Sequence, residues 1–176
     1  KGLNRKLDSF PKINSMQKYF QFSFLFLLIF TFAQKKPDNT FVKEHYNKKE
    51  VYITMRDGVK LFTSIYTPKD ISKTKKLPFL MQRTCYSVAP YGETEYPRSL
   101  GPNKYLMNDE YIFVYQDVRG RYMSEGTFTH MTPQVERKSK KDVDESTDTY
   151  DTIDWLIKNI ENNNKKVGQY GTSYPG

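Results

Sequence analysis

The sequence is poor in the two residue types that most often form crosslinks, metal sites and general bases. Among its 176 residues it has one cysteine, Cys85, and two histidines, His45 and His130. A single cysteine cannot form an internal disulfide, so the fold must be stabilised by its hydrophobic core. This composition excludes the class of small disulfide-stapled domains, and the sequence predicts no resident cofactor.

Long apolar runs are equally scarce, and the one present lies near the N-terminus. Residues 22–32 are almost continuously apolar, with Lys18 before them and Thr31-Phe32-Ala33 at their end, which is the arrangement of a cleaved signal peptide. As a helix, residues 20–33 would reach about 21 Å, short of the roughly 30 Å needed to span a bilayer. No cysteine follows the run to carry a lipid. We therefore expect an exported protein, periplasmic or extracellular, without a stable membrane anchor.

The ends of the sequence indicate a piece of a longer protein. It begins at Lys1, and its first methionine is Met16. Residues 1–15 are therefore interpreted as neighbouring or untranslated sequence, and residues 16–33 as the signal peptide. The polar residues 34–47 predict a tether that leads into a folded domain at 48–176.

The net charge of +8 does not predict a nucleic-acid partner. Half of it comes from residues 1–18, before the expected cleavage site. The rest is spread thinly, and the cluster Lys73, Lys75 and Lys76 lies beside turn signals, where solvated charge is the simplest explanation.

The first half of the predicted domain reads as strands joined by a hairpin and a crossover. Two alternating runs, 51–55 and 60–66, flank an Asp-Gly pair and predict a β-hairpin. Residues 77–82 and 111–115 are apolar without alternation, as in strands buried on both faces. A short helix is expected between them at 103–109, and the order strand, helix, strand indicates parallel pairing. The chain is therefore predicted to form an α/β fold.

The clearest helical pattern covers residues 143–160. Its apolar face is expected to hold Tyr150, Ile153, Ile157 and Ile160, widened by Trp155 and Leu156. Its first turns carry Asp142, Asp144, Glu145 and Asp148, which the helix dipole favours there. This cluster has neither the bend-forming glycine of a calcium loop nor an interleaved histidine, so no metal site is predicted. Residues 162–164 end the helix, and 167–170 predict a strand.

That strand leads directly into Gly171, Thr172, Ser173, Tyr174, Pro175 and Gly176, a Gly-x-Ser-x-Gly pattern typical of a nucleophile elbow. A serine hydroxyl is a weak nucleophile. A tight strand-to-helix turn exposes it to a base and aims a following backbone N–H at the substrate carbonyl. The flanking glycines relieve the crowding in such a turn. Ser173 is therefore the candidate nucleophile.

Four segments, in this order, resemble the family of cocaine esterase, X-prolyl dipeptidyl-peptidases, glutaryl cephalosporin acylases and α-amino acid ester hydrolases. They are 55–61 (MRDGVKL), 82–86 (QRTCY), 116–126 (QDVRGRYMSEG) and 171–176 (GTSYPG). The stretch 142–155 looks especially like the amino acid ester hydrolase and acylase branch. The resemblance runs from about residue 51 to residue 176. It implies the N-terminal part of an α/β-hydrolase, with a mostly parallel central sheet that stops just after the nucleophile elbow.

By position in these motifs, the resemblance implies a role for three residues. Ser173 would be the acyl-accepting nucleophile, and the oxyanion would be bound by the backbone N–H of Tyr174 and the side-chain hydroxyl of Tyr86. A phenol in that place stabilises charge that exists only in the transition state. The family usually has proline where this chain has Cys85, and this change is expected to loosen the loop that aims Tyr86.

Charged residues in the third segment are expected to have a structural role. Asp117, Arg119 and Arg121 would hold a loop by charge-assisted hydrogen bonds rather than take part in the chemistry. Pro175 occupies a variable position of the elbow, where proline costs little because its missing N–H would be unpaired in a first helical turn.

The sequence contains no histidine after Ser173, whereas the triad of α/β-hydrolases follows the order serine, acid, histidine. The acid and the base are therefore expected beyond residue 176, and His130 is interpreted as a surface loop residue. The resemblance also places a helical cap, a jelly-roll domain and the carboxylates that bind the substrate ammonium downstream. The fragment itself is expected to be inactive, with its elbow strand exposed at a sheet edge.

These patterns together predict part of an exported serine hydrolase that cleaves esters or amides through an acyl-serine intermediate. An α-amino acid ester hydrolase or acylase is the leading interpretation, and an X-prolyl dipeptidyl-peptidase is the second. A non-catalytic secreted binding protein on the same fold is the alternative from another class. The expected partner is a small ester, an amide or a short peptide, and homo-oligomer formation is left open for the complete protein.

Overall fold

The structure is a computed structural model that describes residues 40–72, 74–130, 132–136, 139 and 141–175. The expected leader (1–15) and signal peptide (16–33) lie outside these residues. In chain order the elements are α2 (Thr40–His45), β1 (Tyr46–Thr54), β2 (Lys60–Pro68), β3 (Leu77–Thr84), α3 (Lys104–Asn108), β4 (Ile112–Asp117), α4 (Glu145–Asn159) and β5 (Asn163–Gln169).

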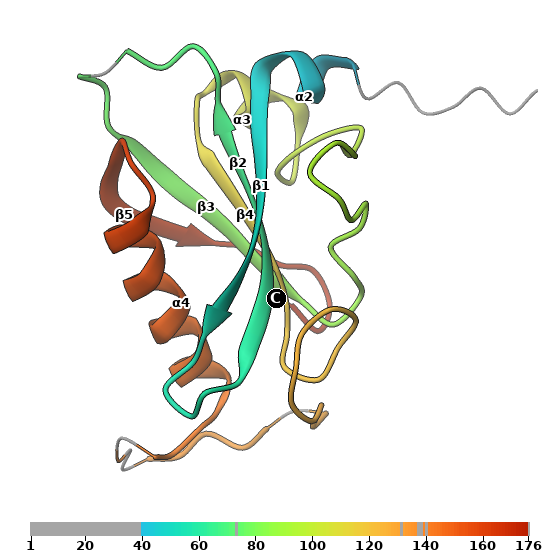
Figure 1. Cartoon of the computed structure of the whole chain (residues 1–176), viewed down its shortest axis with the longest axis vertical. Coiled ribbons are helices and arrows are strands. Elements are labelled where there is room, and N and C mark those ends of the chain that lie inside the picture. The colour runs from blue at the N-terminus through green and yellow to red at the C-terminus, as the bar shows by residue number, and fades with distance from the viewer. Residues whose placement is uncertain (1–39, 73, 131, 137–138, 140, 176) are drawn as a thin grey trace, which may run out of the picture. The chain divides into compact units, whose positions relative to one another are not determined.

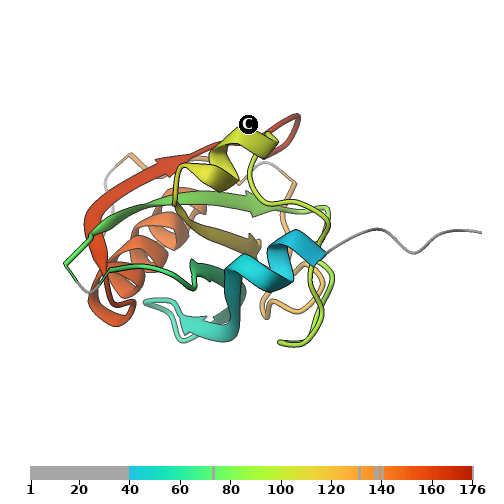
Figure 2. The same cartoon turned by 90° about the horizontal axis from the view of Figure 1, so that it is seen from above.

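The five strands form one mixed sheet in the order β1-β2-β4-β3-β5. Strand β1 pairs antiparallel with β2, and β2 antiparallel with β4, whereas β3 runs parallel to both β4 and β5. Helix α4 covers one face, and α3 and the loop after β3 lie on the other (Figures 1 and 2). The α/β class and the parallel pairing through a crossover are confirmed, and the carboxyl ends of β3 and β5 meet at one edge of the sheet.

The predicted hairpin is confirmed, with a turn at residues 55–59. Strands β1 and β2 pair from Tyr46 opposite Pro68 to Thr54 opposite Lys60. Gly58 has a φ of +89°, a left-handed conformation that favours glycine, and its N–H donates to the Met55 carbonyl over 2.9 Å. The Asp-Gly signal therefore placed the turn correctly.

The expected tether is wrong over residues 40–47, which form α2 and the first residues of β1. Val42 and Tyr46 are buried there, and the Tyr46 hydroxyl donates to the Met107 carbonyl over 2.7 Å. The polar composition of this segment did not predict the helix, because burial of only two residues, Val42 and Tyr46, is enough to dock it on the core.

Strand β5 starts four residues earlier than expected, at Asn163 rather than Val167. Its first residues are Asn-Asn-Lys-Lys, which have low strand propensity, and β5 lies at the edge of the described sheet, where polar side chains remain solvated. Asn163 also ends the preceding helix as predicted, because its side-chain amide donates to the Ile157 and Ile160 carbonyls over 3.1 and 2.6 Å.

Helix α4 has nearly the expected extent, and its expected apolar face is confirmed except at Tyr150; Ile160, just after the helix, is also buried. Leu156 is fully buried, and Ile153, Trp155 and Ile157 pack against the cluster that includes Phe79, Met81 and Val114. Tyr150, placed on the apolar face by the sequence pattern, is 65% exposed. The first two turns bury polar groups instead, namely Thr147, Asp148 and Thr152. The sheet beneath them presents polar side chains, so matching hydrogen bonds outweigh apolar burial at this end.

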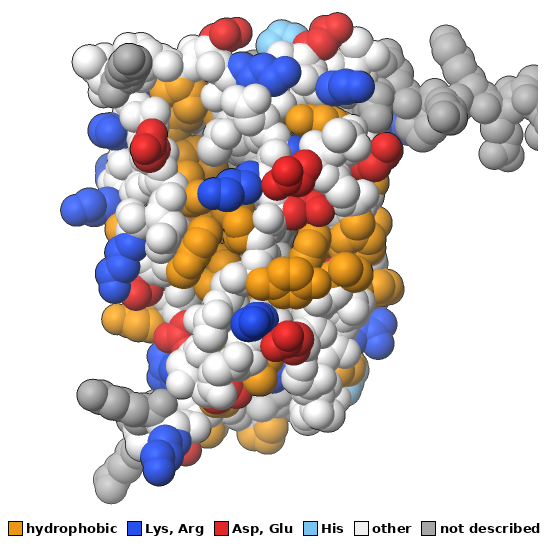
Figure 3. Space-filling model, in the orientation of Figure 1, with side chains coloured by type: hydrophobic (Ala, Val, Ile, Leu, Met, Phe, Trp, Pro, Cys, Tyr) orange, Lys and Arg blue, Asp and Glu red, His pale blue; other side chains and the backbone are white. Residues whose placement is uncertain are grey.

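The described ranges contain no helix that is both long enough and apolar enough to cross a bilayer. On the face seen in Figure 3, hydrophobic side chains form a band across the middle, with acidic and basic side chains interspersed around it.

The start of α4 depends on Asp144, which forms a capping box with Thr147. Its carboxylate accepts from the Thr147 N–H over 2.9 Å, and the Thr147 hydroxyl lies 2.9 Å from the Asp144 N–H. Asp144→Ala is expected to speed hydrogen exchange in the first turn of α4 about fivefold, because losing such a cap costs about 1 kcal/mol. Asp154→Ala, the same change at an exposed ion pair with Lys158, is expected to alter these rates less than about twofold. Equal exchange in Asp144→Ala and the unmodified protein would contradict this role.

Candidate active site

Ser173 lies just beyond β5 in a strained turn. The pairing of β5 with β3 continues to Tyr170, whose N–H donates to the Met81 carbonyl over 3.0 Å. Three residues later Ser173 has a φ of +63°, which is uncommon for a residue with a side chain. Its side chain is exposed. A serine held in the left-handed region just after a parallel strand has the local geometry of a nucleophile elbow.

Tyr86 comes from the end of the neighbouring strand. It follows β3, and its backbone N–H donates to the Thr84 side-chain oxygen over 3.0 Å. Its side chain is 58% exposed, and its hydroxyl lies 3.4 Å from the Ser173 Oγ. Parallel pairing of β3 and β5 thus brings together two residues that are 87 positions apart in the chain. A substrate carbonyl attacked by Ser173 would lie within reach of the Tyr86 hydroxyl.

The Tyr174 ring packs against the loop that follows β4. It lies 5.9 Å from the Phe128 ring and 5.5 Å from the His130 ring, measured between centroids. His130 is exposed, as the sequence suggested, but it lies beside the elbow rather than in a remote loop. No sequence signal marked this contact, because residues 118–130 have no regular secondary structure.

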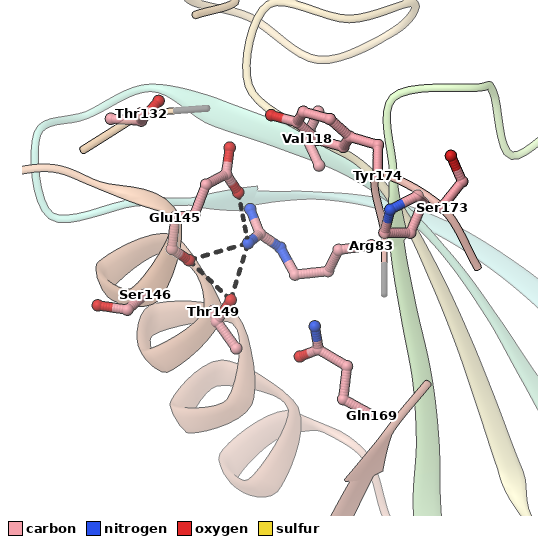
Figure 4. A pocket seen from close by; sticks show the side chains of 10 residues that line it. Arg83, Val118, Thr132, Glu145, Ser146, Thr149, Gln169, Ser173 and Tyr174 are labelled. Carbon is pink, nitrogen blue, oxygen red and sulfur yellow. Dashed lines mark hydrogen bonds and ion pairs between the residues drawn. The ribbon is translucent and has the colours of Figure 1, made fainter. Parts of the chain in front are cut away.

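A cavity of about 550 Å³ opens between the elbow and the first turns of α4. Figure 4 shows Ser173 and Tyr174 on one side of it, Glu145 and Thr149 of α4 on the other, and the Arg83 side chain between them. Arg83 Nη1 donates to the Glu145 carboxylate over 2.8 Å, to its carbonyl over 2.9 Å and to the Thr149 hydroxyl over 2.7 Å. The wall of this cavity is therefore a fixed, charge-paired surface.

Sequence reasoning assigned no role to Arg83, although it lies in one of the four segments. It is 4% exposed and donates through Nε to the Gln116 side chain over 2.7 Å. The Gln116 amide nitrogen in turn donates to Thr63 and Thr152 over 3.0 and 2.9 Å. An arginine in an otherwise buried strand was the available signal, because a buried charge requires partners. The network fixes β3, β4 and α4 relative to one another beneath Ser173.

Asp117, Arg119 and Arg121 form loop-holding hydrogen bonds of the kind expected from the sequence. The Asp117 side chain is fully buried and accepts from the Val88 N–H and the Tyr91 hydroxyl, each over 3.0 Å. Burial raises the pKa of the Asp117 carboxyl, and these hydrogen bonds offset the shift in part. Asp117 therefore acts as an acceptor that ties the loop after Tyr86 to the end of β4.

Arg119 joins the hairpin turn to α4. It donates to the Asp57 carboxylate over 2.7 and 3.2 Å and to the Asp148 carboxylate over 3.0 and 2.7 Å. Partial burial disfavours its charge, but the two carboxylates raise the pKa of Arg119. The acidic residues at the start of α4 are thus engaged in caps and ion pairs. Among the described residues, no group of three or more His, Cys, Asp or Glu side chains could hold a metal ion.

Comparisons with known proteins place these observations in a family context. The family model for the X-Pro dipeptidyl-peptidase (S15 family) matches residues 57–176. Cocaine esterase from Rhodococcus sp. (strain MB1 Bresler) is 31% identical over 129 residues, which cover 72% of this chain and 19% of that protein.

Two solved structures are similar in both sequence and fold. An aminopeptidase from the marine sediment archaeon Thaumarchaeota archaeon has a TM-score of 0.64 and 36% identity, and the match covers 81% of this chain and 23% of that one. An α-amino acid ester hydrolase has a TM-score of 0.63 and 37% identity over 81% of this chain and 25% of its own. The chain thus spans about a fifth to a quarter of the length of these relatives.

Proposed function

The chain belongs to the X-Pro dipeptidyl-peptidase (S15) family, and from that premise we propose that it carries the nucleophile of an exported serine hydrolase. The proposed enzyme cleaves ester or amide bonds through an acyl-serine intermediate. The observation that carries the proposal is the 3.4 Å approach of the Tyr86 hydroxyl to the Oγ of Ser173, a residue with a φ of +63°.

The proposed chemistry assigns one task to each of three groups. Ser173 Oγ attacks the substrate carbonyl carbon and loses its proton to a base. The carbonyl oxygen becomes an oxyanion, which accepts hydrogen bonds from the Tyr86 hydroxyl and the Tyr174 N–H. Collapse of the tetrahedral species expels the alcohol or amine, which takes the proton from the protonated base, and leaves the acyl group on Ser173. Water then gives a proton to the base, attacks the acyl carbon and releases the acid, and the base returns that proton to Ser173.

The base is proposed to be a histidine that follows Ser173 in the complete protein, paired with an acid that lies between them in the chain. This is the order of triad residues in α/β-hydrolases. The matched part of this chain covers only 19% and 25% of two of these relatives, which supports the proposal that further parts of the site come from elsewhere in a longer protein. Export by a signal peptide at 16–33 stays a prediction.

Within this class, we propose an α-amino acid ester hydrolase or acylase rather than an X-prolyl dipeptidyl-peptidase. The supporting observation is the stretch 142–155, which resembles the amino acid ester hydrolase and acylase branch, together with the 37% identity to an α-amino acid ester hydrolase. Hydrolysis of phenylglycine methyl ester by the complete protein, faster than release of nitroaniline from Gly-Pro-nitroanilide, is the result that the proposal expects. The reverse order would favour the dipeptidyl-peptidase.

The hydrolase proposal itself is tested by covalent labelling. A fluorophosphonate is expected to modify the complete protein at Ser173, because an activated serine attacks phosphorus as it attacks a carbonyl. Peptide mapping should place the label on the segment that contains Ser173, and Ser173→Ala should abolish it. A correctly folded complete protein that takes up no label would instead be a binding protein that kept the fold without its activity.

A further inference from the structure

The residues that follow β4 contact both sides of the proposed oxyanion site. We define this segment, residues 118–130, as the bridging loop. At one point it contacts the backbone of the segment that carries Tyr86, and at another it contacts the ring of Tyr174. Sequence reasoning treated Tyr86 and Tyr174 as independent donors, but the structure connects them through this loop.

The bridging loop is held in one conformation by its own hydrogen bonds. The Gly120 N–H donates to the Glu125 carbonyl over 2.9 Å, and the Ser124 N–H donates to the Arg121 carbonyl over 2.9 Å. A side chain on Gly120 would overlap the backbone of Thr127 and Phe128, so the two halves of the loop lie in direct contact.

The same loop is anchored to strands on either side. The Ser124 hydroxyl donates to the Asp117 carbonyl over 2.6 Å and accepts from the Phe62 N–H over 2.8 Å. The Glu125 N–H donates to the Lys60 carbonyl over 3.0 Å. These bonds tie the backbone of the loop around Ser124 to β2 and to the end of β4.

Arg121 is the side chain through which the bridging loop contacts the segment of Tyr86. Its Nε donates to the Cys85 carbonyl over 3.1 Å, at the residue immediately before Tyr86. Its guanidinium lies 5.1 Å from the centre of the Phe128 ring, and Phe128 lies 5.9 Å from the Tyr174 ring. Within the described ranges the guanidinium forms no ion pair with a carboxylate. It also lies 5.1 Å from the centre of the neighbouring Tyr122 ring. The contacts with the Cys85 carbonyl and Phe128 thus connect Arg121 to the two flanks of the proposed oxyanion site.

The contacts of Arg121 also compensate for the presence of cysteine at position 85, where the resembling family usually has proline. Proline would restrict the backbone before Tyr86 by fixing φ, whereas cysteine leaves that torsion free. The Arg121 hydrogen bond to the Cys85 carbonyl restrains the next peptide unit, the one that joins Cys85 to Tyr86. Cys85 itself is buried, with 6% of its surface exposed. The loosening expected at this position therefore has a specific restraint opposing it.

We propose that Arg121 is a positioning residue that holds the Tyr86 hydroxyl at its working distance from Ser173. It does so through the Cys85 carbonyl, and Phe128 fixes the guanidinium relative to the elbow. The inference rests on the proposed function, because it assumes that Tyr86 binds the oxyanion. It adds that the position of the Tyr86 hydroxyl is set by Arg121, a cation that follows the next strand of the chain, β4, and that touches neither substrate nor nucleophile.

The test is a double-mutant cycle in the complete protein with phenylglycine methyl ester or another turned-over ester as substrate. Arg121→Gln is expected to lower kcat roughly tenfold with KM changed less than about twofold, because a small misplacement of one oxyanion donor weakens transition-state binding. In a Tyr86→Phe background the same change is expected to lower kcat by less than about twofold, since the hydroxyl it positions is absent. Arg121→Lys, which keeps a charged donor, is expected to recover part of the loss.

A matched control is Arg56→Gln. Arg56 also combines hydrogen bonds with an aromatic contact, since it pairs with Asp151 over 2.8 Å and lies 5.9 Å from the Tyr150 ring, but it does so on the hairpin turn. The kcat of the Arg56→Gln variant is expected to stay within about twofold of that of the unmodified enzyme. An equal loss for Arg121→Gln with and without the Tyr86 hydroxyl would overturn the inference.

Failure of the inference is distinguishable from failure of the proposed function. If Ser173 takes up the fluorophosphonate and Tyr86→Phe lowers kcat, but the Arg121 effect is additive, the inference alone is wrong. If Ser173 takes up no label and Tyr86→Phe leaves kcat unchanged, the proposed function fails first. Should Arg121→Gln not fold, the same cycle with Arg121→Lys gives the coupling.

Discussion

Ser173→Ala in the complete protein is expected to lower kcat for ester hydrolysis by about 10⁵- to 10⁶-fold, because the bond-forming atom is removed and only oxyanion binding and substrate positioning remain. KM is expected to change little, since the hydroxyl contributes mainly to bond formation. The measurement is steady-state hydrolysis under substrate saturation, with enzyme prepared free of unmodified protein. Alanine is the suitable replacement, because it removes the hydroxyl and places no other polar atom in the cavity.

The control for this change is Ser72→Ala, which removes an exposed serine hydroxyl whose contact is with Thr74. It is expected to retain kcat within about twofold, as surface substitutions of this kind have small effects. Residual activity of Ser173→Ala within about tenfold of the unmodified enzyme would contradict the assignment, because a nucleophile cannot be nearly dispensable in acyl transfer.

Tyr86→Phe is expected to lower kcat by about 100- to 1000-fold, the usual effect of deleting one oxyanion donor. The 3.4 Å separation between its hydroxyl and Ser173 Oγ places the donor beside the reacting centre, where negative charge develops. Phenylalanine keeps the ring, so KM is expected to stay within about threefold. Initial rates over a range of substrate concentrations separate the two constants.

Tyr105→Phe is the matched control for Tyr86→Phe. Tyr105 is 68% exposed on α3, and its loss of a hydroxyl is expected to change kcat less than about twofold. If Tyr86→Phe instead raised KM and left kcat unchanged, the hydroxyl would bind the ground state, and a binding role rather than oxyanion stabilisation would follow.

The approach of Tyr86 to Ser173 illustrates what the sequence could predict. The parallel relation of β3 and β4 followed from their uninterrupted apolar runs and from the helix between them. The Gly-x-Ser-x-Gly pattern after a strand placed Ser173 at the carboxyl edge. Since Tyr86 also follows a buried parallel strand, the sequence contained the information that puts both residues at that edge, although not that their strands are neighbours.

Other features could not be predicted, because they depend on contacts between distant segments. Tyr150 has the spacing of an apolar stripe, but the sheet beneath the first turns of α4 is polar at Gln116 and Arg83, and this rotates the buried face toward Thr152. The spacing of apolar residues along a helix shows which side chains share one face, but it does not show whether the sheet surface packed against that face is polar or apolar. The packing of His130 on Tyr174 was equally invisible, because it joins a loop without a pattern to an elbow 44 residues away.

The two halves of α4 differ in the kind of bond that attaches them to the sheet, and this sets how much sequence change each half tolerates. Apolar contacts around Leu156 specify proximity and volume, so exchanges among aliphatic residues of similar size are compatible with them. The hydrogen bonds of Thr147, Asp148 and Thr152 specify direction, and a shorter, longer or apolar replacement leaves a buried partner without its match. The half nearer Ser173 is therefore the half in which drift among homologous sequences should be slow, whereas the far half is free to vary while the fold stays the same.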